Sequence, residues 1–90
     1  MGRHPLLPPG VSPTEFGQRI MKWGRGEDAL KRIETITAEE LRSVGVSSDM
    51  AEAWRDMYRE WATLHPENPS APYRAQLMAH VAALLERQDF

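Results

Sequence analysis

The sequence contains no cysteine, which excludes disulfides, thiolate metal ligands and cysteine nucleophiles. It also lacks a long apolar run. Residues 81–85 hold only Val, Ala and Leu, and they fall far short of the roughly 20 residues that span a bilayer. The opening residues 1–13 contain no apolar core of a secretory signal. We therefore expect a protein that is cytoplasmic as synthesised and has no membrane partner.

No sign of charge dominates, since 11 basic residues oppose 13 acidic ones and the formal net charge is −2. A dedicated nucleic-acid binder usually carries a clear basic excess, so this balance argues against one. The length of 90 residues indicates one domain. A chain of this size buries roughly 60–65% of its unfolded surface, which suffices for one modest core.

Start and stop signals divide the chain into about five helices, and no stretch has the alternation of a strand. The expected helices cover residues 13–23, 27–34, 38–44 and 49–65 and a final segment after Ser70. The proline-rich residues 1–12 are expected to form an extended arm, and residues 13–90 a single helical domain. The predicted fold class is all-α, a small compact bundle.

The helix boundaries rest on capping residues. Ser12 with Glu15, and Thr37 with Glu40, have the spacing of capping boxes at helix starts. Glycines 24 and 45 are typical stop residues. Pro66 ends the fourth helix, because the residue before a proline disfavours helical geometry.

Apolar spacing predicts which face of each helix enters the core. The fourth helix has the strongest pattern, in which steps of four and three alternate as in an a/d seam. We expect the apolar side chains of this seam on the fourth helix to pack against the other helices and form one core. Its residues are Met50, Trp54, Met57, Trp61 and Leu64. The other expected stripes are Phe16, Ile20 and Trp23; Ala29, Leu30 and Ile33; and Tyr73, Leu77, Val81 and Leu84.

The stretch "LRSVGVSSDMAEAW" can be read as a helix-hairpin-helix that clamps DNA phosphates, or as an ordinary joint between two helices. In the first reading, backbone N–H groups at the turn and nearby basic side chains hold phosphate. Ser48, Asp49 and Glu52 occupy the positions that should be basic, and carboxylates repel phosphate. The structural joint is favoured, with Gly45 as a helix stop.

Four carboxylates lie on one face of the fourth helix, opposite the seam. This face could dock a basic partner or hold a cation, but a solvated face with local ion pairs is the favoured interpretation. A single row lacks the convergent geometry that cations need, so we expect no metal there. The candidate docking face consists of Asp49, Glu52, Asp56 and Glu60.

Arg74 falls inside the apolar arc of the last helix. A guanidinium there needs a carboxylate, several carbonyl partners or a cleft to line. We name a candidate binding cleft from Trp23, Arg32, Tyr58, Asn68 and Arg74. Neither His65 nor His80 has metal-ligand spacing, and no phosphate or dinucleotide fingerprint occurs, so no metal or cofactor is expected.

The segments "GVSPTEFGQRIMKWGRG", "GVSSDMAEAWRDMY" and "NPSAPYRAQLM" resemble a bacterial family of domains of unknown function. That family is found at the C-terminal tips of Rhs- and PAAR-type polymorphic toxins and as short stand-alone or prophage-borne proteins. The resemblance covers about residues 10–80. The residues that carry it include Phe16, Gly17, Trp23, Arg32, Gly45, Trp54, Tyr58, Asn68, Pro69 and Arg74.

The resemblance implies an effector or cargo domain, exported by a type VI-like apparatus and met by an immunity protein or a delivery-apparatus protein. It assigns no catalytic residue, so whether the protein is an enzyme stays open. The alternative function is a non-enzymatic interaction module that docks through the acidic face or an exposed part of the Trp/Met seam. Binding of nucleic-acid backbone comes third.

Overall fold

The computed structural model describes residues 5–24 and 27–88, and all regular structure in these residues is helical. The prediction of an all-α bundle is confirmed. Within the described ranges no helix is long and apolar enough to cross a membrane. The elements are α1 (Pro13–Glu15), the π-helix η1 (Phe16–Met21), α2 (Glu27–Thr35), α3 (Ala38–Ser43), α4 (Ser48–Leu64) and α5 (Ser70–Gln88).

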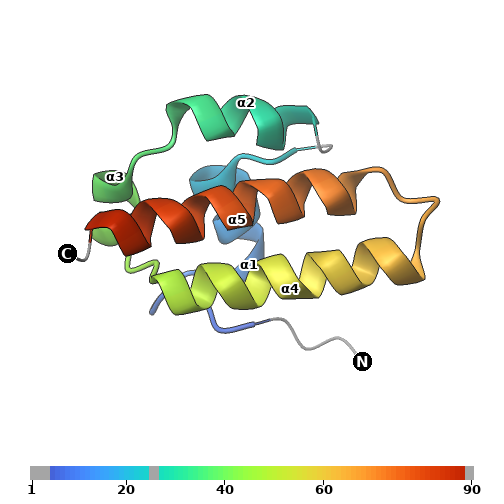
Figure 1. Ribbon diagram of the computed structural model, residues 1–90. Coiled ribbons are helices and arrows are strands. Elements are labelled where there is room, and N and C mark those ends of the chain that lie inside the picture. Colours follow the sequence, from blue (N-terminus) through green and yellow to red (C-terminus); the bar gives the residue numbers. More distant parts are fainter. Residues whose placement is uncertain (1–4, 25–26, 89–90) are drawn as a thin grey trace.

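The two longest helices, α4 and α5, form an antiparallel hairpin (Figure 1). Helix α2 packs on the side of α5 that faces away from α4, and η1 lies behind α5 (Figure 1). Helix α5 is therefore the central element. The loop end of the hairpin extends beyond α2 and η1, so that among the described helices only α5 lies beside the last turns of α4 (Figure 1).

Two predicted helix boundaries are formed by the expected residues. The Thr37 hydroxyl accepts a hydrogen bond from Glu40 N at 3.2 Å and starts α3. The α3–α4 joint is a Schellman motif, in which Gly45 N donates to Arg42 O and Val46 N donates to Leu41 O. Gly45 has the positive φ, 88°, that this motif requires.

The first helix differs from the prediction in its geometry. The Ser12 hydroxyl accepts from Glu15 N as expected, but the chain then widens into a π-helix that ends at Met21. Lys22, with φ at 51°, turns the chain. Hydrogen bonds from residue i to residue i+5 change the angle between successive side chains. As a result Met21 and Trp23 are both buried, whereas an α-helix would place these two positions on different faces.

The core is built on aromatic rings from distant parts of the chain. Phe16 stacks on Trp54 with ring centroids 4.9 Å apart and meets Trp23 edge-on at 5.9 Å. On the far side of the same cluster, α5 buries Leu77 and Val81. These rings bring η1, α4 and α5 together.

The predicted seam along α4 is wrong at its C-terminal end. Trp54 is buried and Met57 half-buried, whereas Trp61 is 46% exposed and Leu64 is 64% exposed. The helical period places all these residues on one side of α4. They differ in burial because no third helix among the described elements packs against the loop end of the hairpin. The expected stripe of α2 is also incorrect at Leu30, which is 37% exposed.

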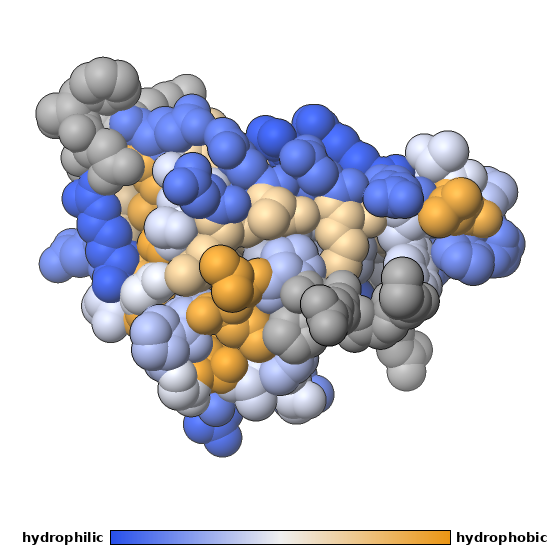
Figure 2. All heavy atoms as spheres, turned by 90° about the horizontal axis from the view of Figure 1, so that it is seen from below, coloured by the Kyte–Doolittle hydropathy of each residue, from blue (hydrophilic) through white to orange (hydrophobic). Residues whose placement is uncertain are grey.

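The proline-rich arm packs along the domain from Pro5 onwards. Pro8 is fully buried, and the Trp54 indole Nε1 donates to Leu6 O at 3.1 Å. Pro8 also lies against the turn between α3 and α4, because a Cβ added at Gly45 would meet its side chain at 3.4 Å. Seen from below, apolar side chains gather near the middle of this face, where the arm lies under α4 (Figure 2).

Candidate functional site

A pocket of about 240 Å³ opens at the loop end of the α4–α5 hairpin. Helix α4 supplies an aromatic and thioether wall, the loop supplies an amide, and α5 supplies its first turn and a guanidinium. The residues that line it include Met57, Tyr58, Trp61, Asn68, Ala71 and Arg74. Three of the five predicted cleft residues therefore meet in one pocket.

Arg74 stands against an aromatic surface. Its guanidinium carbon lies 5.0 Å from the ring centroid of Trp23 and 5.7 Å from that of Tyr58, which are cation–π distances. Its Nη2 donates to the backbone oxygen of Gly24 at 2.9 Å. Its Nε is buried and has no acceptor among the described residues. Among the described residues, the guanidinium thus has the backbone oxygen of Gly24 as an acceptor, the Tyr58 side chain as a polar neighbour and two ring faces.

Trp23 lies behind this pocket and does not line it. Its ring is almost fully buried and meets Tyr58 edge-on at 5.2 Å. The Trp23 ring packs against the Arg74 guanidinium and so helps to hold it in position. Of the predicted cleft residues, Tyr58, Asn68 and Arg74 therefore line the pocket, and Trp23 packs against two of them, Tyr58 and Arg74.

The polar groups of the pocket differ in how far the protein already uses them. The Asn68 Oδ1 accepts from Ser70 N at 3.0 Å and caps the start of α5, which leaves the Nδ2 group for a ligand. Burial raises the pKa of the Tyr58 phenol above its usual value of 10.0, and the Arg74 guanidinium opposes this shift. Tyr58 is thus a neutral hydrogen-bonding group near pH 7.

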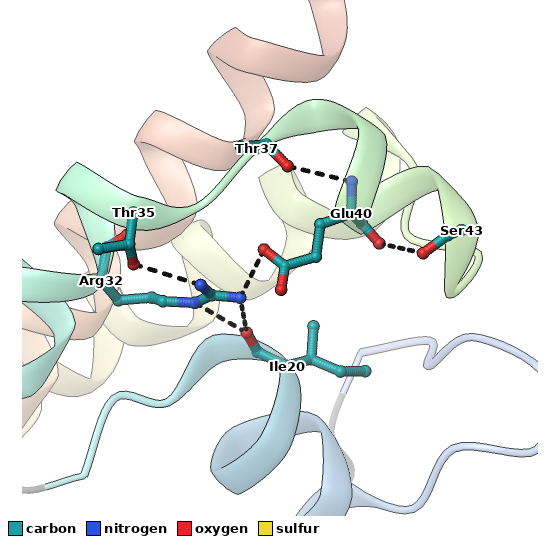
Figure 3. Close-up of polar contacts among 6 residues, drawn as sticks. All are labelled: Ile20, Arg32, Thr35, Thr37, Glu40 and Ser43. Carbon is teal, nitrogen blue, oxygen red and sulfur yellow. Dashed lines mark hydrogen bonds and ion pairs between the residues drawn. The ribbon is translucent and has the colours of Figure 1, made fainter.

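Arg32, the fifth predicted residue, belongs to a different part of the molecule. It is only 6% exposed, and its Nε and Nη2 donate to Ile20 O at 3.1 and 2.9 Å (Figure 3). Its Nη1 donates to the Thr35 hydroxyl, and Nη2 lies 2.8 Å from Glu40 Oε1. Arg32 thus caps the Ile20 carbonyl near the end of η1 and links α2 and α3 to it.

Sequence reasoning missed the contribution of Trp61 to the pocket, because it assigned this ring to the core. Trp61 lines the pocket on one side and stacks on His65 at 4.9 Å. His65 Nδ1 lies 3.3 Å from Glu67 Oε2. The signal available was position: Trp61 comes five residues before the helix-ending Pro66, at the end of a helix that only one neighbour covers.

The predicted acidic face lies on the outer side of α4. Asp49, Asp56 and Glu60 are exposed, and Arg55 Nε donates to Asp56 Oδ1 at 3.0 Å. Glu52 is half-buried and faces Glu86 of α5, and this neighbour raises the pKa of Glu52 above 4.5. In the described part of the chain, no three His, Asp or Glu residues are grouped as a metal ion would need.

The turn between α3 and α4, which the sequence offered as a possible phosphate-binding site, is already in contact with the protein's own groups. Pro8 and Pro9 of the arm lie against Gly45, and the Ser47 hydroxyl accepts from Met50 N at 3.2 Å. This geometry is that of a joint between helices α3 and α4.

Comparison with known proteins gives a family and a fold. The model of a family described as "Domain of unknown function (DUF4951)" matches residues 2–85. A solved structure described as "NMR structure of the protein from Acinetobacter baumannii" is 35% identical, with a TM-score of 0.77 over 93% of this chain and 82% of that one. No curated protein matches. Neither match mentions a ligand, an activity or Rhs and PAAR toxins.

Proposed function

Because this chain belongs to the DUF4951 family of domains, whose description assigns no activity, we propose a function from the contacts of its own residues. The proposal is a non-enzymatic interaction module that docks a segment of a partner protein at the loop end of the α4–α5 hairpin. The docking site comprises the pocket of Tyr58, Asn68 and Arg74 and the exposed rings and side chains beside it, Trp61 and Leu64.

One observation carries the proposal: Trp61, 46% exposed, stands at the side of a pocket that also holds an arginine and a tyrosine. Large apolar side chains that stay exposed beside a polar pocket often mark interaction sites. Tryptophan, tyrosine and arginine are also the residues that contribute most to binding free energy at protein interfaces. The face seen from below has a further apolar group at the end where α4 finishes (Figure 2).

The composition of the pocket favours binding over catalysis. Its lining residues carry a guanidinium, an amide, hydroxyls, a thioether and an indole. None of these groups exchanges protons near neutral pH, as a general acid or base must. Burial raises the pKa of Tyr58, which makes its phenolate still less available. The pocket can orient and hold a ligand without any proton transfer.

A second docking surface is the acidic face of α4, with Asp49, Asp56 and Glu60 exposed and Glu52 at its edge. It would suit a basic partner. Arg55 already neutralises part of its charge. We therefore place the primary docking site at Trp61.

The second candidate function is that of an effector cargo domain, as the resemblance to polymorphic-toxin tips suggests. The convergence of three hydrogen-bonding side chains in one pocket is the feature in its favour. In that setting the partner would be an immunity protein or a delivery-apparatus protein, and export would use a type VI-like apparatus. Expression in the cytoplasm and in the periplasm of a bacterium should then arrest growth, and Arg74→Gln should relieve the arrest. Normal growth in both compartments would exclude this role.

The docking proposal is tested by comparing two variants that each remove an exposed apolar side chain. Trp61→Ala removes the ring beside the pocket, and Leu30→Ala removes an exposed side chain on α2. A direct partner, verified with both proteins purified, should bind Leu30→Ala as it binds the wild type. It should bind Trp61→Ala at least tenfold more weakly, since interface tryptophans contribute about 2 kcal/mol or more. Equal affinity for all three proteins would contradict the proposal.

A further inference from the structure

The pocket beside Trp61 offers hydrogen-bond donors and positive charge without any negative charge. Among the described residues, none of those that line it is an aspartate or a glutamate. Asn68 uses its Oδ1 on Ser70 N, so its free polar group is the donating Nδ2. Arg74 supplies the cation. We infer, on the basis of the proposed docking function, that this pocket binds the side-chain carboxylate of an acidic residue in the partner's docking segment.

Arg74 is the main reason for assigning an anion. Among the described residues no carboxylate lies within ion-pair distance of it, and one backbone oxygen, that of Gly24, accepts a hydrogen bond from it. A guanidinium has five N–H donors, and the contacts with Gly24 O and the Tyr58 side chain use only part of them. The rings of Trp23 and Tyr58 hold the guanidinium in place, which reduces the entropy lost when an anion binds.

The start of α5 adds to the positive potential. Ser70 and Ala71, the first two residues of this long helix, line the same pocket as Arg74. Helix N-termini carry a partial positive charge that favours anions. The helix terminus and the guanidinium therefore act in the same direction on one small volume.

The size and the apolar wall of the pocket identify the kind of anion. Its volume of about 240 Å³ is below the range of about 300–1,000 Å³ that holds drug-sized ligands, so it fits one side chain. Met57 and Trp61 form an apolar wall beside the donors. A single guanidinium balances one negative charge. A carboxylate followed or preceded by a bulky apolar residue matches this arrangement better than a phosphate, which carries close to two charges.

The test uses two capped peptides that differ by one group, acetyl-Leu-Glu-Phe-amide and acetyl-Leu-Gln-Phe-amide. Each is titrated into the full chain while NMR follows Arg74 Nε–H, Asn68 Nδ2–H₂ and the Trp61 indole N–H. The glutamate peptide should shift all three signals to saturation, and the glutamine peptide should bind at least tenfold more weakly. Sodium acetate and inorganic phosphate are titrated separately as free anions.

Two variants of equal charge provide the control. Asn68→Asp keeps an oxygen that can cap Ser70 N but replaces the donor in the pocket with a negative charge. Gln76→Glu adds the same charge at an exposed site of α5 outside the pocket. Asn68→Asp should abolish the preference for the glutamate peptide, and Gln76→Glu should leave it within twofold of wild type.

The outcomes separate this inference from the docking proposal. Equal affinity for both peptides would overturn the carboxylate inference and leave the docking site intact. The same holds if neither peptide binds although Trp61→Ala weakens binding of the partner protein. Tighter binding of inorganic phosphate than of the glutamate peptide would also overturn it. Partner binding that is indifferent to Trp61→Ala would overturn the docking proposal itself.

Discussion

Replacing Arg32 with methionine removes every donor of the guanidinium while it keeps a side chain of similar length in the core. In the folded protein this guanidinium donates to Ile20 O through both Nε and Nη2 and to the Thr35 hydroxyl through Nη1. Its ion pair with Glu40 spans 2.8 Å (Figure 3). The substitution therefore isolates the polar contribution of one buried residue.

The size of the effect follows from which partners stay behind. The Ile20 carbonyl would remain buried without a donor, which costs about 1–3 kcal/mol, and hydrogen bonds to a charged group contribute about 1.5–3 kcal/mol. These amounts overlap. The ion pair adds less than about 1 kcal/mol, because Glu40 is 41% exposed and the solvent screens it. We expect a loss of about 3 kcal/mol, a large part of the roughly 5–13 kcal/mol that stabilises a domain of this length.

Urea unfolding followed by circular dichroism measures this loss. With an m-value of about 1.5 kcal/mol per molar urea, the midpoint should fall by about 2 M at unchanged m. Lys31→Met, at the neighbouring exposed position, is the matched control and should shift the midpoint by less than about 0.3 M. If the two variants unfold at the same urea concentration, Arg32 is not the link that holds η1 to α2.

Three further predictions concern other parts of the fold. Gly17→Ala places a Cβ 2.7 Å from Trp23 Nε1, so we expect a loss of about 1–3 kcal/mol by overpacking and a changed near-UV circular dichroism of the tryptophans. An unchanged melting temperature would contradict the close approach. Glu86 raises the pKa of Glu52, so the folded state binds a proton more tightly than the unfolded state, and the pair destabilises the protein as pH rises through the raised pKa. Glu52→Gln should therefore raise the melting temperature at pH 7 but give no gain at pH 3, and a gain at both pH values would refute the carboxylate pairing. The Arg32 hydrogen bond holds the pKa of Glu40 below 4.5, and its stabilising effect is present above the unfolded pKa and lost as pH falls through the folded one. An NMR titration should find this pKa moved upward in Arg32→Met, and no movement would remove the proposed cause.

The helix boundaries were predictable because they depend on residues close together in the chain. Thr37, Ser12 and Gly45 act on atoms within a few positions of themselves. The π-helix was not predictable in this way. Its advantage is that it brings Met21 and Trp23 into a core to which α4 and α5, far away in sequence, also contribute.

The candidate site was predicted in part for a similar reason. The helical period placed Arg74 among apolar residues, where a guanidinium must find partners or line a cleft, and it does line one. The same reasoning placed Trp61 in the core, because spacing alone does not tell how many helices surround a face. Arg32 was placed in the cleft and instead caps η1, since its acceptor lies 12 residues away on another element.

The sequence by itself determined that the chain is helical and where its helices begin and end. It also indicated Tyr58 and Arg74 as residues of one candidate cleft. The tertiary structure decided which apolar side chains became core and which stayed at the surface. That division depends on neighbours: Trp54 packs against the arm and Phe16. Among the described elements, only α5 lies beside the end of α4 that carries Trp61, two turns later. Burial is a property of the assembled helices, so no single helix could specify it.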